Sequence, residues 1–445
     1  MSLGMMPQKG KQKIGHIVTR PGKRPGDPPI TIPVAEILET VPGIPTRDED
    51  VTFYSREYPL DTLNVDERAS RDWGNRLRDM NPEMREIRRE HDRLNRPIIE
   101  AGRLQGGMEP TAEPVPGKDV TEDIRAKARE LGFLEVGFTK YDTRYTYARM
   151  RDRIEYEHAI ALAWEQDYEA TQTIPSIAAE IVHSGTYRTM GAAALELCEF
   201  IRSLGYHVQQ HSPNDNTGAY LPMCVAAGIG QLGACGYLLT PHAGGRCRIM
   251  LLSTNAQVTY DQPVDYGIHA FCQICQVCVT RCPGRALMPG KVVWRGVEKN
   301  KLNFKRCRPV MARYLGCGIC MKVCPIQKYG MQKVMEHFVD TGEVLGKGTD
   351  ALEGYTLEAT GATGSKTLGY FGPGQLPVFD ASFFDMPHGK AEDWAFEVLV
   401  KKLKKAGSLQ TDEGLKALEE FKTQLGVALS LSDDILKMEL EDYIT

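Results

Sequence analysis

The sequence has no long apolar run, because polar residues interrupt every hydrophobic stretch well before it could cross a membrane. A membrane-spanning helix needs about twenty predominantly apolar residues, so we expect none here. The polar, basic stretch from Met1 to Arg24 also lacks the apolar centre of a secretory signal. Arg88 and Arg89 lie too far along the chain to form a twin-arginine export signal. We therefore expect neither a membrane span nor export.

The chain also lacks a strong excess of one charge. Its 54 lysines and arginines nearly balance 58 aspartates and glutamates, which leaves a formal net charge of −4. A protein that binds nucleic acid or an acidic membrane surface usually carries a basic excess. The composition therefore gives no reason to expect a nucleic acid or a membrane as a partner.

Cysteine is abundant and unevenly placed. Most of the 12 cysteines lie in two runs, Cys272-x2-Cys275-x2-Cys278-x3-Cys282-Pro283 and Cys307-x9-Cys317-x2-Cys320-x3-Cys324-Pro325. The first run has the spacing of bacterial ferredoxins, and the second repeats it with its first cysteine set further back. Short Cys-x2-Cys turns can direct three thiolates at one iron–sulfur cluster, which needs four. The spacing therefore predicts two 4Fe–4S clusters.

In two-cluster ferredoxins, the fourth cysteine of each run binds the other cluster. We therefore assign one cluster to Cys272, Cys275, Cys278 and Cys324, and the other to Cys282, Cys307, Cys317 and Cys320. Zinc is a poorer match, since it favours paired Cys-x2-Cys knuckles. A disulfide scaffold is expected in a small secreted chain, which this is not. Oxygen-sensitive clusters without an export signal favour the cytoplasm.

Composition divides the chain into four parts. Residues 1–120 are rich in proline and are expected to form an extended wrap, with a disordered tail over 1–30 and a charged helix from Pro82 to about Leu94. The other parts are a sheet domain over 121–265, a cysteine module over 266–330, and a glycine- and aromatic-rich cover with C-terminal helices over 331–445. Closing helices are expected near 411–425 and 432–442.

The sheet domain repeats a helix–glycine–strand unit, which predicts an α/β or α+β fold. One helix begins at Thr121 and ends before Gly132, and a second covers 190–204 before Gly205. The expected strands cover residues 133–138, 158–164, 206–209 and 249–253. Cys198 and Cys224 are expected in the core. Cys247 should face away from the arginines on either side of it.

The order of these motifs resembles a known family. FIRSLGYHV at 200–208 is followed by LPMCVAAGIGQLGACGYLLTPHAGGRCRIMLLSTN at 221–255, and then by the two cysteine runs. This succession is similar to that of the cobalamin-dependent reductive dehalogenases, whose nearest sister group is the epoxyqueuosine reductases. The similarity covers 121–345. One departure is Ala234-Cys235, where the family often carries Gly-Arg.

The resemblance implies a nitroreductase-like core that binds a base-off corrinoid (cobalamin), followed by a bacterial-ferredoxin-like module with two 4Fe–4S clusters. It implies reductive dehalogenation of an organohalide, with electrons passing from an external ferredoxin, flavodoxin or reductase through the clusters to cobalt. The proton-donating tyrosine falls on Tyr187, and its basic partner on Arg246, with Arg248 as the alternative. A tyrosine keeps its proton at neutral pH, and an arginine beside it stabilises the phenolate. Residues 342–374 are expected to close the substrate pocket.

A glycine-rich stretch matches the dinucleotide-binding fingerprint G-x-G-x-x-G, but no strand precedes it and no acid follows at the required distance. We instead expect its backbone to lie against the corrinoid at Gly228, Gly230, Gly233 and Gly236. Three further candidates for bonds to the corrin rim or the substrate are Asn214, Asn216 and Thr217. As a turn cluster, these three need no function at all.

Two other functions remain open. Epoxyqueuosine reduction on transfer RNA uses the same cofactors, but an RNA substrate should need a basic docking face. A ferredoxin-like electron carrier would need no corrinoid at all.

Overall fold

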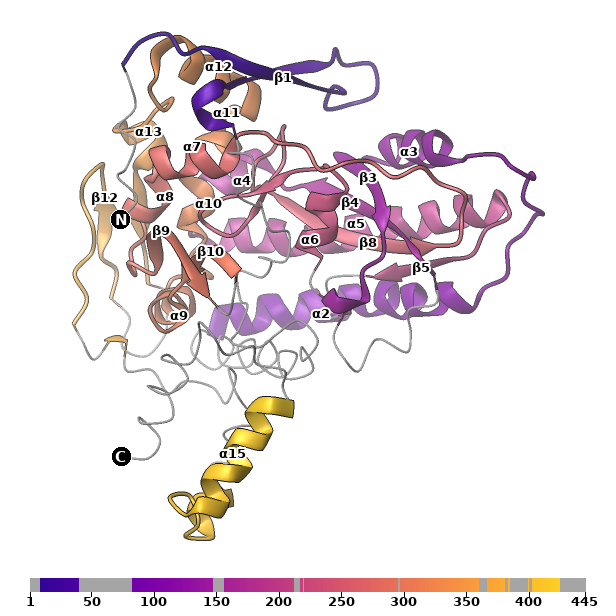
Figure 1. Ribbon diagram of the computed structural model, residues 1–445. Helices are drawn as coiled ribbons and strands as arrows, with labels where there is room; N and C mark the ends of the chain where they lie inside the picture. Colours follow the sequence, from indigo (N-terminus) through magenta and orange to yellow (C-terminus); the bar gives the residue numbers. More distant parts are fainter. Residues whose placement is uncertain are drawn as a thin grey trace.

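A four-stranded antiparallel sheet in the order β3-β4-β8-β5 forms the centre of the fold (Figure 1). Its strands are β3 (Glu135–Lys140), β4 (His158–Glu165), β5 (Val208–His211) and β8 (Cys247–Thr254). The computed structural model describes residues 9–39, 82–146, 156–211, 217–218, 220–294, 297–359, 366–380, 383–384, 399 and 402–424. The sequence therefore predicted all four strands, with bounds shifted by a few residues.

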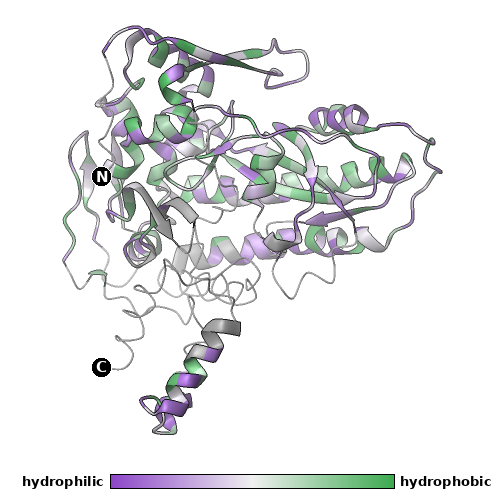
Figure 2. Cartoon of the chain, in the orientation of Figure 1, coloured by the Kyte–Doolittle hydropathy of each residue, from purple (hydrophilic) through white to green (hydrophobic). Residues whose placement is uncertain are grey.

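The sheet is covered on both faces, which explains why β4 is apolar along most of its length. Ile160 and Leu162 pack against α3 (Thr121–Glu130) and α5 (Ile177–Ser203) on one face. The alanines between them pack toward α6 (Leu221–Ala226) on the other. The apolar residues of this layer are drawn in green in Figure 2.

Cysteines of the sheet domain lie as the sequence predicted. Cys198 is fully buried on the α5 face, and Cys224 on the α6 face. Cys247 packs with the α6 face, away from the two arginines beside it. Burial raises the pKa of Cys198 to about 12, so its thiol stays neutral.

Helix α5 is much longer than predicted, since it begins at Ile177 rather than near residue 190. Ser176 caps it, because the Ser176 side chain accepts a hydrogen bond of 3.0 Å from the amide of Ala179. Gly191 inside the helix allows close contact with α2, where an added Cβ would lie 2.7 Å from Ile98. Tyr187 therefore lies within α5 and not before it.

Helix α2 (Pro82–Leu104) also exceeds its predicted end near Leu94 and continues through Pro97. The side-chain amide of Asn95 donates a hydrogen bond of 2.8 Å to the backbone carbonyl of His91, one turn earlier in the helix. Packing against α5 supports the part that proline would otherwise disfavour.

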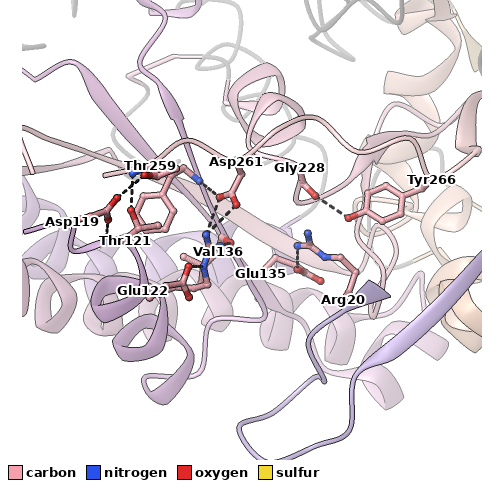
Figure 3. A network of polar contacts seen from close by, with 12 residues as sticks. Arg20, Asp119, Thr121, Glu122, Glu135, Val136, Gly228, Thr259, Asp261 and Tyr266 are labelled. Carbon is pink, nitrogen blue, oxygen red and sulfur yellow. Dashed lines mark hydrogen bonds and ion pairs between the residues drawn. The ribbon is translucent and has the colours of Figure 1, made fainter. Parts of the chain in front are cut away.

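The N-terminal segment forms a hairpin, so the expected disordered tail over residues 1–30 is wrong for its second half. Strands β1 (Ile14–Arg20) and β2 (Ile30–Ala35) pair antiparallel. The carboxylate of Glu135 is 1% exposed and lies 2.9 Å from the guanidinium of Arg20. Figure 3 shows this ion pair. This buried ion pair fixes the end of β1 against the sheet, while Ile32 and Val34 pack with α12 (Met331–Thr341) and the cysteine module.

The cysteine module contains short helices around a hairpin. These elements are α7 (Ile268–Cys275), α8 (Val277–Thr280), β9 (Leu287–Trp294), β10 (Val297–Leu302), α9 (Phe304–Arg313), α10 (Ile319–Lys322) and α11 (Pro325–Tyr329). Gly267 before α7 and Gly318 before α10 both have positive φ, which glycine tolerates without strain. In the cysteine repeat, the counterpart of Gly318 is Gln276 before α8, which also has positive φ, so the two halves share this turn.

The remaining described elements are short or terminal. They are η1 (Glu36–Leu38), η3 (Gln105–Gly107), η4 (Thr143–Tyr145), α4 (Tyr168–Gln172), β6 (Gln231–Leu232), β7 (Leu238–Leu239), α13 (Asp350–Glu353), β11 (Tyr355–Leu357), β12 (Gly369–Phe371) and α15 (Asp412–Gln424). α15 matches the first predicted closing helix, and the second, near 432–442, lies outside the described residues. Of the helices that the structure describes, none combines the length and apolarity needed to cross a bilayer.

Candidate functional site

Eight thiols of the cysteine module gather in two groups. The first thiol group contains Cys272, Cys275, Cys278 and Cys324, and the second contains Cys282, Cys307, Cys317 and Cys320. Each group takes three thiols from one run and one from the other: Cys324 interacts with Cys275, and Cys282 with Cys307. The structure therefore brings together the two sets assigned from the spacing.

The chain around the two thiol groups contains turns whose residues adopt the left-handed backbone conformation, with positive φ. Among the described residues, the non-glycine positions with positive φ all lie in the cysteine module: Gln276, Arg285, Leu315 and Cys317. Such a conformation costs about 1 kcal/mol or more per residue, and strain of this kind concentrates at functional sites. Here it points backbone amides toward sulfur, since Val277 donates to Cys275 and Ile319 donates to Cys317. The turns are therefore built to stabilise negative charge on the sulfur atoms.

Cys275 and Cys324 are buried and the other six cysteines of the two groups are half-buried, and this limits what their thiols can bind. Burial raises the pKa of Cys275 to about 11 and that of Cys317 to about 12. Their thiolates therefore need a cation beside them, which iron would supply. Within the described part of the chain, no three His, Cys, Asp or Glu side chains lie close enough to share one metal ion. The spacing of the two runs matches a cuboidal cluster better than zinc, which favours paired Cys-x2-Cys knuckles.

Arg281, which sequence analysis missed, fastens the glycine-rich segment to this module. It is 1% exposed, and its guanidinium donates to the carbonyls of Glu353 and Phe371, both at 3.1 Å, and to that of Gln375. It also lies 4.7 Å from the centre of the Tyr355 ring. In the sequence, the only indication of this role was that Arg281 directly precedes Cys282-Pro283 at the end of the first cysteine run.

The described part of the glycine-rich segment packs on the cysteine module, and its closing of a substrate pocket stays a prediction. Tyr355, Phe371 and Phe379 pack into the hydrophobic cluster that also contains Cys275 and Cys324. The described part of this segment covers the cysteine module, because its aromatic side chains find their apolar surface there.

Tyr187 lies beside Arg248 rather than Arg246. The guanidinium of Arg248, on β8, is 4.6 Å from the centre of the Tyr187 ring on α5. The ring of His91, on α2, meets the Tyr187 ring edge-on with 5.6 Å between centres. Tyr187 and Arg248 are both half-buried. A phenol held against a guanidinium, with partial access, can release a proton and have the remaining charge stabilised.

Arg246 has a different partner. It is 3% exposed, and one of its nitrogens donates at 2.6 Å both to the carboxylate of Glu165 and to the carbonyl of Gln166. Its guanidinium lies 5.2 Å from the ring centre of Tyr168 on α4. The charge of Arg246 is thus compensated by Glu165, at the edge of the site.

His183 lies one turn before Tyr187 on α5, and no sequence motif had identified it as a candidate site residue. It is 6% exposed, and its ring lies 3.0 Å from the hydroxyl of Thr171. Burial, reinforced by the nearby charge of Arg248, lowers the pKa of His183 to about 4. His183 is therefore neutral at physiological pH, and Arg248 is the permanent cation beside Tyr187.

The loop containing Tyr237 connects the thiol groups with Tyr187. On one side, Tyr237 packs against the hydrophobic cluster around Cys235 and Leu287, against which Cys278 and Cys282 also pack. On the other side it packs with Ala179 at the start of α5, and it interacts electrostatically with Arg248. Tyr237 thus lies near both the cysteine module and Arg248, the arginine that contacts Tyr187.

The glycines predicted to border the corrinoid lie next to this loop. Neighbouring atoms of the protein leave no room for a side chain at Gly228, Gly230 and Gly233. An added Cβ at Gly228 would lie 2.5 Å from the carbonyl oxygen of Gln262, and one at Gly230 would lie 2.7 Å from that of Leu239. Gly233 contacts the Leu239 side chain, and Gly236 has a φ of 80° in the turn. The hydroxyl of Tyr266 donates to the carbonyl of Gly228 at 2.9 Å (Figure 3). Their contact with a corrinoid remains a prediction.

Two buried polar side chains point to a missing partner. Thr217 is 1% exposed and its hydroxyl has no hydrogen-bond partner among the described residues. Gln166 is fully buried beside Arg246. Neither the nitrogen nor the oxygen of its side-chain amide has a hydrogen-bond partner among the described residues. Asn214 and Asn216 lie outside the described residues. Buried polar atoms without partners are costly, so they indicate a place for a ligand or water.

No family model matches the chain. A tetrachloroethene reductive dehalogenase from Dehalobacter restrictus is 33% identical over 184 residues, which is 38% of this chain and 33% of the relative. An epoxyqueuosine reductase from Lactococcus garvieae is 28% identical over 261 residues, 47% of this chain and 70% of the relative. The aligned part thus spans about a third of the dehalogenase relative's length.

Solved structures show the same likeness of fold. The catabolic reductive dehalogenase NpRdhA superposes with a TM-score of 0.52 at 21% identity, over 64% of this chain and 45% of that one. A reductive dehalogenase structure described as B12-dependent gives a TM-score of 0.50 at 22% identity, over 64% and 46%. The resemblance to reductive dehalogenases expected from the sequence is thereby confirmed, with epoxyqueuosine reductases as more distant relatives.

Proposed function

We propose that this protein is a reductive dehalogenase that uses a corrinoid and two 4Fe–4S clusters to replace a halogen of an organohalide with hydrogen. One observation carries the proposal: two groups of four thiols are linked through the Tyr237 loop to the Tyr187–Arg248 pair. The similarity to tetrachloroethene reductive dehalogenases supports the reaction class.

The thiol groups fit two clusters by number and chemistry. Each offers four sulfur ligands from buried or half-buried cysteines, with backbone amides aimed at Cys275 and Cys317. Such amide bonds stabilise the negative charge that a reduced cluster carries. The two groups lie side by side, since Cys320 of the second group and Cys324 of the first both interact with Cys235. This closeness suits the passage of single electrons from an external donor.

A corrinoid fits the polar atoms that the protein leaves without partners. The rim of a corrin carries amide groups, which would complement Gln166 and Thr217 and, as predicted from the sequence, Asn214 and Asn216. The backbone from Gly228 to Gly236 would border it. When bound, the corrinoid would supply the low-potential cobalt that breaks the carbon–halogen bond.

The proton in this reaction comes from the protein. Replacing a halogen with hydrogen consumes two electrons and one proton and releases a halide ion. Tyr187 supplies the proton from its hydroxyl, and Arg248 stabilises the phenolate until solvent returns a proton. Sequence analysis assigned the basic role to Arg246, but Arg248 is the arginine in contact with the ring.

Reconstitution tests the proposal. The protein is loaded anaerobically with iron, sulfide and cobalamin, and its iron, cobalt and released halide are counted with tetrachloroethene and brominated phenols as substrates. We expect about eight irons and one cobalt per chain. We expect Tyr187→Phe to keep both metals and to lower halide release about 100-fold or more, the usual contribution of a general acid. Full iron without cobalt uptake would instead identify an electron carrier.

Epoxyqueuosine reduction is the second candidate, because the chain covers 70% of one such reductase. It predicts affinity for a transfer RNA stem-loop that weakens as salt is raised. Halide release without such affinity would eliminate it.

A further inference from the structure

Charge is distributed unevenly between the cysteine module and the rest of the chain. Residues 266–330 contain 12 lysines and arginines and a single acidic residue, Glu298. The module therefore carries a formal charge of +11, and because the whole chain carries −4, the remainder carries −15. Two 4Fe–4S clusters with their thiolates would offset only about four of these positive charges. A large positive excess thus remains on the module.

The positive residues concentrate on the elements that carry the second thiol group. Residues 299–308, from β10 into α9, include Cys307 and five positive residues: Lys299, Lys301, Lys305, Arg306 and Arg308. Leu287 and Leu302 of the β9–β10 hairpin belong to the buried cluster against which Cys282, Cys307 and Cys320 pack. Figure 1 shows β9, β10 and α9 together at one edge of the molecule.

The arginines whose side chains are described at this edge are not neutralised by carboxylates. Arg285 is exposed. Arg306 donates to the carbonyl of Gly284 at 2.6 Å, and Arg313 donates to that of Phe383 at 2.8 Å. None of these three arginines forms an ion pair with a described acidic side chain. Hydrogen bonds to neutral carbonyls leave the charge in place, so this edge presents a positive field to the solvent.

The second thiol group is also the more accessible of the two. Its four cysteines are all half-buried, whereas Cys275 and Cys324 of the first group are buried. A cluster held by the second group would therefore lie nearer to the surface, where an electron donor can approach it. The positive edge and the accessible thiol group coincide.

The surface beside Tyr187 does not share this excess. Helix α2, whose His91 contacts the Tyr187 ring, carries six arginines and five acidic residues. Arg89 and Arg93 are each paired with a glutamate one turn earlier, at 2.8 and 2.6 Å. An RNA substrate would have to reach Tyr187, so its basic docking face is expected on that side. The excess on the module instead favours a partner that exchanges electrons with the second cluster.

We infer that the β9–β10 hairpin and α9 form a docking face for an acidic one-electron carrier protein. The inference rests on the proposed function, because it needs a cluster at the second thiol group. Opposite charges on two proteins accelerate their encounter, and salt weakens this effect by screening the charges. Each encounter transfers one electron, which oxidises the carrier and reduces the second cluster, and no bond is made or broken.

The test uses the full chain loaded anaerobically with iron and sulfide, without cobalamin. The probe is an acidic flavodoxin in its reduced form, and the measurements are its affinity and the rate at which it reduces the clusters. Affinities for a basic cytochrome c and for a transfer RNA stem-loop are measured beside it. We expect the reduction rate of the unmodified protein to fall about tenfold or more between about 0.05 and 0.5 M ionic strength.

A charge-reversed variant locates the face. Lys299→Glu, Lys301→Glu and Lys305→Glu are combined, and we expect reduction at low salt to slow about tenfold or more. The matched control combines Lys140→Glu, Lys404→Glu and Lys405→Glu, three exposed positions outside the module. It changes the net charge by the same amount and should stay within about twofold of the unmodified protein. Iron counts and denaturant unfolding show whether both variants fold, and the salt series needs neither of them.

Several results would overturn the inference: reduction that does not depend on salt, equal effects of the two triple variants, or cytochrome c binding as tight as that of flavodoxin. Tighter binding of the stem-loop at these lysines would assign the face to RNA, and salt-dependent self-association in place of flavodoxin binding would assign it to a second copy of the chain. Charge-dependent flavodoxin binding by a protein that releases no halide would uphold the docking face and overturn the proposed function. If the protein binds no iron, the proposed function fails, and flavodoxin affinity still decides the docking face.

Discussion

The two arginines at the start of β8 have separate environments, although two residues apart in sequence. Arg248 contacts the ring of Tyr187, whereas Arg246 is bonded to Glu165 and to the backbone of Gln166. The first can stabilise charge on a reacting group, and the second mainly compensates a carboxylate. This difference can be tested residue by residue.

Arg248→Gln should lower halide release about 100-fold, because a neutral amide stabilises the Tyr187 phenolate poorly. Arg246→Gln is the matched variant, and it should instead lower the free energy of unfolding by about 1 kcal/mol, since it removes a charged hydrogen bond to Glu165, which keeps its ion pair with Lys23. The measurements are halide release per iron-loaded protein and denaturant unfolding. The reverse pattern, with turnover lost only in Arg246→Gln, would restore Arg246 as the partner of Tyr187.

Among the elements, the β1–β2 hairpin and the segment around β11 and β12 are each bound to the rest of the fold by an arginine, half-buried Arg20 and buried Arg281. Arg20 reaches Glu135 on β3, and Arg281 reaches three carbonyls of the glycine-rich segment. Buried arginines satisfy several acceptors at once because their five N–H groups form a rigid fork. Each therefore connects segments far apart in sequence.

Arg20→Ala should lower the free energy of unfolding by about 3 kcal/mol, because Glu135 would remain charged and buried without a partner. Arg24→Ala, at an exposed position beyond β1, should change it by less than about 0.5 kcal/mol. Denaturant unfolding of both variants gives the comparison. Equal effects would mean that the ion pair does not hold the hairpin.

Arg281→Lys should loosen the glycine-rich segment, because one ammonium group cannot satisfy three separate carbonyls. We expect faster hydrogen exchange at residues 369–375 and faster bleaching of the clusters in air. Arg313→Lys, which loses one hydrogen bond to Phe383, is the control and should change both rates less. Exchange rates that match the unmodified protein would show that apolar packing alone holds this segment.

For the molecule as a whole, two buried histidines link stability to pH. Burial lowers the pKa of His183 to about 4 and that of His211 to about 3. In the unfolded chain both titrate near pH 6.5. Protons then bind the unfolded state first, so the folded state loses stability as pH falls from about 6.5 toward 4.

We expect the free energy of unfolding to fall by up to about 1.4 kcal/mol per pH unit for each histidine below pH 6. His211→Gln should remove one of these contributions, so its stability should depend less steeply on pH. Denaturant unfolding between pH 7.5 and 5 measures both slopes. Parallel slopes would show that His211 does not contribute.

The cysteine spacing and the apolar runs anticipated a large part of this architecture, because their causes are local. Two thiols separated by two residues can share one turn, and an apolar run of strand length requires cover on both faces. The crossed grouping that brings Cys324 to the first group also followed from the repeat. The bounds of α2 and α5 could not be predicted from the sequence. Pro97 and Gly191 normally disfavour a helix, and here the packing of the two helices against each other supports them.

The sequence by itself determined the four strands, the two sets of thiols and the resemblance to reductive dehalogenases. Only the tertiary structure decided that Arg248 faces Tyr187, that Arg281 fastens the glycine-rich segment, and that Cys320 and Cys324 both lie near Cys235. The physical reason is the separation in sequence between the residues that make each contact. Spacing and periodicity record neighbours along the chain, whereas these three contacts join side chains far apart in sequence, which meet only when the sheet, helices and module are packed together.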